Sequence, residues 1–414
     1  MLSAHQAREA VNAMGEPLPK PSGFACHWSL DPSVVYLNHG SFGATPKAVQ
    51  EARRAWEERL EAEPVRFFVE DYWGLMDSVR AAIGELVKWP AECIVPVANA
   101  TAGVAAVLTG LGLGTGDELL INQHEYPACR SNARAAGART GATVVDASVP
   151  FPIRDEDEAV SAIMSRVTGR TRAALFSHVT SPTGLVLPVE RLAAELESRG
   201  VFVLIDGAHA PGMIEGLDLS RINAHAYVAN NHKWLCAPKA SGFLAVRPDV
   251  RARLRPHVLS NFAESPRPGR DHFTTEFDYV GTQSVSAWLA VPDAIRCLNG
   301  LVPGGIDAVA RRNRELCLSV RRALCGRWGV EAPAPESMIG SIATLLLPDA
   351  VGPIVPGLRY ADALQEALVT AWNIQVPVWF APGTARRTLR VSCQLYNAPE
   401  QYEYLARAVL SQRP

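Results

Sequence analysis

The sequence predicts an α/β protein with a large, mostly parallel β-sheet and a smaller α+β domain near its C-terminal end. Apolar stretches of strand length alternate along the chain with longer stretches of helical length. The strand-length stretches are apolar throughout, as expected of strands that are covered on both faces. Small or polar residues follow them directly, which places those residues at the carboxyl edge of the sheet, where ligands bind.

The composition fits a protein with a large core and a small-molecule partner. The 414 residues carry a net charge of −2 and 48% of them are hydrophobic, enough chain for a large domain and a smaller one. The mixed charges give no reason to expect nucleic acid or a membrane surface as a partner, and no apolar run approaches the ~20 residues of a membrane span. The N-terminus lacks the apolar core of a secretory signal, and the eight scattered cysteines form no C-x-x-C pair. We therefore expect a cytoplasmic protein without a metal site or disulfides.

The N-terminal segment is expected to contain little structure before its first strand. Proline and glycine punctuate residues 1–30, and residues 34–37 read as a short strand. The loop 38–43 holds two glycines, which predicts a close backbone approach to a ligand or to another chain. Thr45 then begins a helix that runs to about residue 63.

A candidate anion site follows the next strand. A helix over about 71–88 leads to a strand at 94–98, and a helix of small residues begins directly after it. The free N–H groups of Ala100 and Thr101 at that helix start would bind an anion such as a phosphate. An ordinary N-cap by Asn99 or Thr101 explains the same residues equally well.

An aromatic residue follows the strand at 118–121. Tyr126 lies just beyond it and could stack on a flat ligand ring, and a plain loop tyrosine is an equal interpretation. Thr180 begins a loop after a further apolar strand. The alternation continues with strands at 144–145 and 172–179 and with helices at about 156–167 and 188–200.

Two strand ends carry the strongest chemical signal. The apolar run 201–205 ends in Asp206, with His209 shortly after it, and the run 226–229 is followed by Lys233. Burial at a strand end lowers the pKa of an amine and makes it a usable nucleophile or base. Pyridoxal phosphate (PLP) needs such a lysine to hold its aldehyde as a Schiff base, and a carboxylate to pair with its ring nitrogen. Taken singly, Asp206 reads as a helix N-cap and Lys233 as a surface charge; together they favour PLP chemistry.

Five candidate residues share one position in the pattern. Each follows a predicted strand, so a parallel sheet would bring them to one edge: Thr101, Tyr126, Thr180, Asp206 and Lys233. The rest of the chain is predicted to add a returning strand at 242–246, a loop-rich segment at 261–282, long helices after Ser284 and at 304–327, and strands at 342–347 and 389–392.

The chain resembles the class V aminotransferase family of fold-type I PLP enzymes over nearly its whole length. The resemblance is carried by LNHGSFGATP, NQHEYPA, FSHVTSPTGLVLPVERL, LIDGAHAPG, NNHKWL, VGTQ, IQVPVW and LRVSCQLYN. The Asp-Gly-Ala-His and His-Lys motifs are specific for the cofactor class, and VTSPT, VPVW and QLYN are similar to the isopenicillin N epimerase branch. The resemblance implies an N-terminal arm at 1–44 that joins the small domain, a large PLP-binding domain at 45–290 and a small domain at 291–414.

The resemblance implies that the family's cofactor-binding residues have counterparts here. Lys233 would hold the aldehyde, Asp206 would keep the pyridine nitrogen protonated, and Tyr126 would stack on the ring. The phenolic oxygen would face His209 and Thr180. The counterparts around the phosphate are Ala100, Thr101, Asn230 and His232.

Substrate binding and assembly are implied in the same way. Arg390, together with Asn38, would bind the α-carboxylate of an amino-acid substrate through its planar guanidinium. Thr282 would reach the phosphate bound in the neighbouring subunit, so we expect a homodimer. Arg386 or Arg387 could bind a distal carboxylate, and solvated loop arginines are the simpler interpretation.

The resemblance implies a reaction at the α-carbon, with three outcomes left open. Epimerisation or racemisation would use Lys233 as base on one face and Tyr126 as acid on the other. The same chemistry could end as C–S β-elimination from a cysteine conjugate, or as transamination with a keto acid. Desulfurase members carry a catalytic cysteine shortly before the carboxylate-binding arginine; the matching loop 375–383 has none, and Cys393 reads as a core residue. A family member that acts by binding alone would usually lack Lys233 or Asp206, and both are present.

Overall fold

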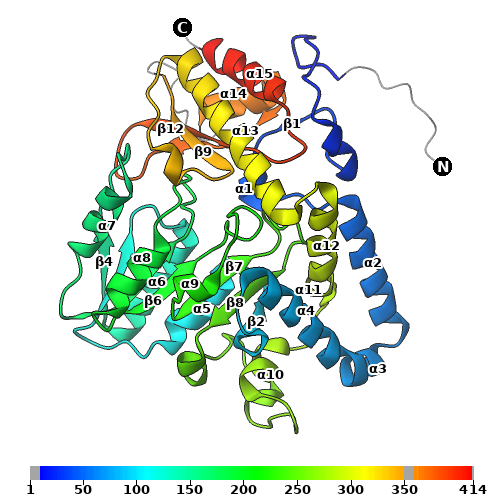
Figure 1. The fold of residues 1–414 in the computed structure, drawn as a ribbon, viewed down its shortest axis with the longest axis vertical. Helices are drawn as coiled ribbons and strands as arrows, with labels where there is room; N and C mark the ends of the chain where they lie inside the picture. Colours follow the sequence, from blue (N-terminus) through cyan, green and yellow to red (C-terminus); the bar gives the residue numbers. More distant parts are fainter. Residues whose placement is uncertain (1–9, 349–358, 361, 413–414) are drawn as a thin grey trace.

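A seven-stranded sheet forms the centre of the computed structural model, which describes residues 10–348, 359–360 and 362–412 (Figure 1). The strand order is β2-β8-β7-β6-β5-β3-β4. The strands from β7 to β4 in this order run parallel, and β8 is antiparallel to both of its neighbours, so the predicted mostly parallel sheet is confirmed. The strands are β2 (Ile94–Val97), β3 (Glu118–Asn122), β4 (Thr143–Ala147), β5 (Thr171–Ser177), β6 (Phe202–Asp206), β7 (Ala226–Asn230) and β8 (Gly242–Val246).

Helices cover both faces of this sheet, so it is the middle of three layers (Figure 1). In β6, Val203 and Ile205 belong to the core on one face, and Leu204 belongs to the core on the other. This two-sided burial is why the strands are apolar throughout. One face is covered by α5 (Ala100–Gly110) and α6 (Pro127–Thr140), the other by α7 (Glu156–Met164), α8 (Val189–Glu197) and α9 (Leu219–Ile222).

A smaller sheet with its own helices forms the C-terminal part of the fold, which lies above the large sheet in Figure 1. Its strands pair antiparallel in the order β11-β12-β9. β1 pairs in parallel with β10, so the N-terminal segment adds to this part of the protein. The elements are β1 (Val35–Tyr36), β9 (Ile342–Leu346), β10 (Ile374–Gln375), β11 (Val378–Phe380), β12 (Arg387–Ser392), α13 (Gly305–Trp328), α14 (Ala363–Trp372) and α15 (Pro399–Leu410).

A helical group connects the two parts. It consists of α2 (Lys47–Ala62), α3 (Pro64–Arg66), α4 (Tyr72–Val87), α11 (Ser286–Leu289) and α12 (Val291–Leu301). The helix predicted after Ser284 is broken into α11 and α12, and Pro292 lies in the first turn of α12, where its missing N–H is not needed. Since α12 packs against α2, α4 and α13, it belongs to both parts, and the division at residue 290 stays a prediction.

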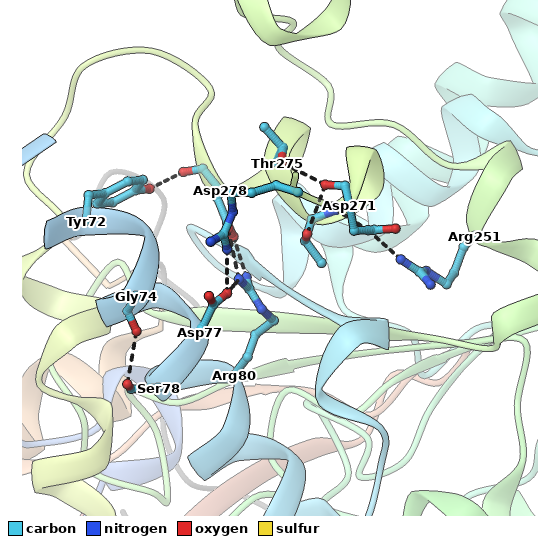
Figure 2. A network of polar contacts seen from close by, with 11 residues as sticks. Tyr72, Gly74, Asp77, Ser78, Arg80, Arg251, Asp271, Thr275 and Asp278 are labelled. Atoms are coloured by element: carbon cyan, nitrogen blue, oxygen red, sulfur yellow. Dashed lines mark hydrogen bonds and ion pairs between the residues drawn. The ribbon is translucent and has the colours of Figure 1, made fainter. Parts of the chain in front are cut away.

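A buried ion pair joins α4 to α10 (His272–Asp278), a helix within the segment predicted to be loop-rich (Figure 2). Arg80 is 4% exposed; its Nη1 lies 2.6 Å from Asp278 Oδ1 and its Nη2 lies 3.0 Å from Asp278 Oδ2. Tyr72 donates a hydrogen bond to the backbone carbonyl of Asp278, and Asp77 also pairs with Arg80. The network fixes the end of α10, from which the chain continues to Thr282.

We expect the Arg80→Met variant to lose about 3 kcal/mol of unfolding free energy, because the buried Asp278 carboxylate is left without its partner. Urea unfolding followed by tryptophan fluorescence measures this loss. The double variant Arg80→Met/Asp278→Leu is the control and should recover most of it, since well-packed apolar residues replace a buried ion pair at little cost. A loss in the single variant no larger than that of a surface pair, about 1 kcal/mol or less, would contradict the assignment.

The structure also shows whether the described residues include membrane-spanning helices, metal-binding groups or disulfides. In the ranges that the structure describes, no helix is both long and apolar enough to cross a membrane. Among the same residues, histidine, cysteine, aspartate and glutamate side chains do not gather into a group of three that could hold a metal ion. The eight cysteines are free thiols, and only Cys26 is exposed.

Candidate active site

A cavity of about 600 Å³ lies at the carboxyl edge of the large sheet. Its walls include residues after β3 and β5, the two strands between which the sheet order reverses, where ligands of such sheets bind. The small sheet contributes Trp379 and Arg390. Four of the five residues that follow predicted strands line this one cavity: Thr101, Tyr126, Asp206 and Lys233.

Lys233 is held at the cavity by contacts to its backbone. His39 Nε2 lies 3.0 Å from the Lys233 carbonyl oxygen. Gly43 has φ +69°, and a Cβ there would meet the His232 carbonyl oxygen at 1.9 Å. The close approach predicted for the loop 38–43 is therefore an approach to the chain's own backbone. This contact fixes the position of the Lys233 backbone at the cavity. The loop itself contains a one-turn helix, α1 (His39–Phe42).

The Lys233 side chain faces His209. Their Nζ and Nε2 atoms are 3.1 Å apart, and Trp234 donates its indole N–H to His209 Nδ1 over 3.2 Å. Because Nδ1 accepts, a neutral His209 carries its proton on Nε2 and donates it to Lys233, which requires an unprotonated amine. Burial lowers the pKa of Lys233 to about 8, although the charge of Asp206 opposes the shift. The site thus holds the lysine close to its nucleophilic form.

Asp206 ends β6 at the floor of the cavity. Its Oδ1 accepts from the backbone N–H of Ala208 over 2.9 Å, and its Oδ2 accepts from the Cys129 thiol over 3.1 Å. Burial raises the pKa of this carboxyl group, while these hydrogen bonds and the Lys233 amine favour its charged form. A cationic ligand group beside Asp206 would be stabilised strongly, since the carboxylate is only 4% exposed.

The N-terminus of α5 provides an anion site at one side of the cavity. Asn99 caps the helix through Ala102, and Asn230 Oδ1 accepts from the N–H of Ala100 over 2.8 Å. Thr101 lines the cavity at the second helical position, where the N–H has no partner within the helix. His232 and Lys239 also line the cavity. This combination of helix start, hydroxyl and cation suits a phosphate group.

Arg390 on β12 provides a second anion site. Its Nη1 donates to the Ser181 carbonyl over 2.6 Å and its Nη2 to Ser41 Oγ over 3.0 Å. Its guanidinium lies over the Trp379 ring at 4.9 Å, and burial lowers its pKa to about 10. Its Nε is buried and has no hydrogen-bond partner among the described residues. Because Arg390 lines the cavity, its guanidinium can pair with a carboxylate that binds there.

Asn38 and Thr180 do not line the cavity themselves, and each contacts residues that adjoin it. Asn38 Oδ1 accepts from Ser41 Oγ over 2.7 Å and lies 3.5 Å from Arg390 Nη2, so Asn38 supports the arginine and does not line the cavity. The Thr180 hydroxyl lies 2.7 Å from Thr183 Oγ1 and accepts from the Leu185 N–H over 2.8 Å. It organises the turn beneath the cavity, and its neighbours Val179 and Ser181 line the cavity instead.

Three further predicted residues lie outside the cavity of this single chain. The Thr282 hydroxyl lies 2.8 Å from that of Tyr279, beyond the end of α10. Arg387 is bound by Asp362, with a distance of 3.0 Å from its Nε to Asp362 Oδ2. Arg386 is exposed on the loop before β12. Tyr126, by contrast, stands at the cavity mouth, 44% exposed.

Sequence reasoning missed residues that complete the site. Cys129 donates to Asp206 from the first turn of α6, a helix with too many small and polar residues to show an apolar stripe. Trp379 stacks on Arg390 and donates its indole N–H to the Pro182 carbonyl over 2.9 Å. It stands in the VPVW stretch, where the sequence indicates the family resemblance but does not single out the tryptophan. Glu125 lies directly before Tyr126 and is fully buried.

A family model and known relatives each match most of the chain. The family model "Aminotransferase class-V" matches residues 35–349. Isopenicillin N epimerase of Streptomyces clavuligerus is 33% identical over 392 residues, which cover 92% of this chain and 95% of that protein. A probable chloroplastic L-cysteine desulfhydrase of Arabidopsis thaliana is 29% identical over 403 residues, covering 92% and 83%.

Solved structures show the same fold. A lysine-to-alanine mutant of C-DES, with glycine covalently linked to the PLP cofactor, superposes with a TM-score of 0.78 at 21% identity and covers 93% of this chain and 98% of that one. A complex of the cystine C–S lyase C-DES with its product cysteine persulfide has a TM-score of 0.75 at 21% identity and covers 92% and 98%. The predicted fold-type I architecture is therefore confirmed.

Proposed function

The chain belongs to the class-V aminotransferase family, and from this premise we propose that it is a PLP-dependent enzyme that inverts the α-carbon of an amino-acid-type substrate. Two isopenicillin N epimerases, from Streptomyces clavuligerus and Amycolatopsis lactamdurans, are 33% and 34% identical to it over most of their lengths, which supports this choice. The observation that carries the proposal is the Lys233 amine, 3.1 Å from His209 Nε2, in a cavity shared with Asp206 and Arg390.

The groups around the cavity fit PLP. The α5 start with Thr101, His232 and Lys239 suits its phosphate, and Asp206 suits its protonated ring nitrogen. The Arg390 guanidinium, which lines the cavity, would bind the carboxylate of a substrate. When bound, PLP supplies an electron sink that makes the proton on the α-carbon of an amino acid acidic.

Several residues of the chain would then have separate roles in the reaction. Arg390 orients the substrate by its carboxylate, and the Trp379 ring keeps the guanidinium plane fixed. The Lys233 amine accepts the α-proton on its own face of the cavity, for which its pKa of about 8 is well suited. Inversion needs a proton from the opposite side, and we assign that step to the hydroxyl of Tyr126 at the cavity mouth.

The Tyr126→Phe variant tests this assignment. We expect inversion to fall about 100-fold, because the variant keeps the ring and loses the proton donor. Exchange of the α-proton with solvent should persist, since Lys233 remains. Chiral chromatography follows inversion and mass spectrometry follows exchange on the same samples. Inversion at the wild-type rate would remove Tyr126 from the mechanism.

A C–S β-lyase is the second candidate. Relatives named L-cysteine desulfhydrase are 27–30% identical over most of this chain, for example in Arabidopsis thaliana and Oryza sativa. The distal carboxylate of an aminoadipyl substrate would need a further cation, and Arg387 is already bound by Asp362. The lyase would use the same Lys233 base, followed by loss of a sulfur group from the β-carbon.

One experiment separates these reactions. The purified protein is incubated with PLP in deuterated water with isopenicillin N, free L-amino acids and cysteine S-conjugates. The proposed epimerase incorporates α-deuterium and inverts the configuration. Pyruvate and ammonium from cysteine substrates without inversion would establish the lyase, and keto-acid-dependent amine transfer would establish an aminotransferase. Absence of all three reactions in a PLP-loaded protein would refute the proposed activity.

PLP capture by the apoprotein should depend on pH in a characteristic way. Only the neutral amine attacks an aldehyde, so the capture rate should rise with pH and level off above about 8, the pKa of Lys233. Stopped-flow absorbance after mixing apoprotein with PLP measures this rate. Nα-acetyl-lysine is the control, and its rate should keep rising toward the ordinary lysine range. A protein profile that follows the control would contradict the lowered pKa.

We propose that the enzyme works as a homodimer in which Thr282 of the partner subunit completes the phosphate site. Thr282 does not line the cavity of its own chain. Phe42 lines that cavity and is 71% exposed, which supports a covered cavity in the assembly. Analytical ultracentrifugation should show twice the mass of the chain. A monomer with full PLP affinity would contradict the proposal.

A further inference from the structure

Glu125 is a buried acid beside the cavity to which the proposed mechanism assigns no role. It follows β3 in the turn that leads to Tyr126, and it is 1% exposed. Its Oε1 lies 2.6 Å from Asn122 Nδ2, and its Oε2 lies 2.6 Å from Ser177 Oγ. Both partners are neutral, so hydrogen bonds alone compensate the burial of this carboxyl group.

The charged groups around Glu125 do not favour its ionised form. Asp206, across the cavity floor, carries a like charge. Arg130, in the following helix, donates to the Asn122 carbonyl and pairs with Asp146 at 3.1 Å. His124 lies between Thr183 Oγ1 and the Val149 carbonyl, and burial lowers its pKa to about 4, so it is neutral.

The protonation of Glu125 follows from these surroundings. Burial raises its pKa to about 8, and the charge of Asp206 adds to the shift, while hydrogen bonds from Ser177 and Asn122 oppose it. The Cys129 thiol donates to Asp206, and burial raises its pKa well above the usual range, so it adds no charge at neutral pH. Near neutral pH the carboxyl group therefore keeps its proton.

Glu118, on the same strand, shows the opposite arrangement. Its Oε1 accepts from Arg170 Nη2 over 2.6 Å, and its Oε2 accepts from the Thr168 and Thr171 hydroxyls over 2.6 and 3.2 Å. The hydrogen bond from Thr168 is the main cause that lowers its pKa. Glu118 is thus an ionised acid of nearly equal exposure, at 5%, and a matched control for Glu125.

The proton on Glu125 would decide the direction of the Ser177 hydroxyl. A protonated carboxyl group donates to Ser177 Oγ and still accepts from Asn122, so the Ser177 hydrogen is free to point elsewhere. An ionised carboxylate would instead accept a hydrogen bond from the Ser177 hydroxyl, so that this hydrogen could not point into the cavity. Ser177 lines the cavity and pairs with Asp206 in the sheet, at the floor of the site.

We propose that Glu125 keeps its proton in the working protein and thereby turns the Ser177 hydroxyl into the cavity as a hydrogen-bond donor for the ligand at the strand ends. Glu125 is then a positioning residue that acts through Ser177. The proposal rests on the proposed function for the identity of that ligand, PLP, and on the structure alone for the proton.

The first test uses apoprotein and the variants Glu125→Gln and Glu118→Gln. Glutamine reproduces both hydrogen bonds of a protonated Glu125 and cannot ionise. Because the pKa of Glu125 is raised on folding, the wild type loses stability as pH rises from the ordinary glutamate range through about 8. Glu125→Gln should therefore gain in unfolding midpoint over the wild type as pH rises to 8, whereas Glu118→Gln should be less stable at neutral pH. A Glu125→Gln variant as destabilised as Glu118→Gln at neutral pH would overturn the proposal.

Infrared spectroscopy tests the proton directly without depending on variant stability. Wild-type apoprotein at neutral pH should show the carbonyl stretch of a protonated carboxylic acid that persists in Glu118→Gln and is absent in Glu125→Gln. Identical spectra of the wild type and Glu125→Gln in this region would overturn the proposal.

The second test concerns the hydroxyl and uses PLP as the probe. Ser177→Ala should weaken PLP binding about fivefold, the worth of one neutral hydrogen bond. PLP affinity of the wild type should fall above pH 8, where Glu125 ionises and accepts the Ser177 hydroxyl hydrogen bond. The Glu125→Gln variant should not show this fall in affinity. Equal pH profiles for the wild type and Glu125→Gln would overturn the role of the proton. A wild type that binds no PLP would refute the proposed function, and the apoprotein comparison would still decide the protonation.

Discussion

The Lys233→Ala variant is expected to lose α-proton exchange by about 10,000-fold, the upper range for a positioned acid–base group. The Lys233 Nζ lies 3.1 Å from His209 Nε2, and we assign to it both the cofactor attachment and the base, so the variant removes both. The visible absorbance of the purified protein should disappear as well. Exchange is measured by deuterium incorporation into substrate, and attachment by the absorbance spectrum.

Lys239→Ala is the matched control for this prediction. Lys239 lines the same cavity, but its Nζ donates to the Gly43 carbonyl over 3.2 Å. At saturating PLP the Lys239→Ala protein should keep its visible absorbance. If the Lys233→Ala protein stayed coloured and the Lys239→Ala protein became colourless, the cofactor would be attached to Lys239 and not to Lys233.

The Asp206→Asn variant is expected to slow α-proton exchange about 1,000-fold, as for loss of a preorganised charge in a buried site. Asparagine keeps the size and can accept the hydrogen bond from Ala208, but it cannot hold the negative charge that a protonated ring nitrogen needs. Single-turnover exchange with saturating substrate measures the effect.

Two readouts distinguish this charge effect from a structural one. Asp206→Asn should bind PLP and keep its far-ultraviolet circular dichroism, because the Cys129 and Ala208 donors lie near a group of the same shape. Asp206→Glu restores the charge and should recover part of the rate. Full exchange activity in Asp206→Asn would show that the carboxylate does not act on the ring.

The central sheet could be predicted because its physical signal is strong. Strands such as β6 are buried on both faces, so their sequences are continuously apolar, and Asp206 and Lys233 stand out at their ends. Helix α6 could not be predicted from periodicity, because it buries small residues such as Ala133 and Gly137 and has no apolar stripe. No helix was predicted for α14 or α15, although Pro399 in the first turn of α15 is a helix-start signal.

The residues of the site also differ in how well the sequence predicts their positions. Residues directly after strands, with the exception of Thr180, were predictable, because a parallel sheet brings its strand ends together whatever the loops do. Contacts made by loops were not: Thr180 turns its hydroxyl to Thr183, Gly43 packs against His232, and Glu125 is enclosed by partners 3 and 52 positions away in the sequence. Such pairings depend on tertiary geometry that no local pattern carries.

The role of Lys233 is tested most directly by locating the cofactor on the chain. Purified protein is loaded with PLP, reduced with borohydride to make the lysine linkage permanent, digested and analysed by mass spectrometry. We expect one phosphopyridoxyl group per chain, on Lys233 within the stretch HAYVANNHKWL. Modification of Lys239 or of surface lysines, or none at all, would contradict the claim that the site is built around Lys233.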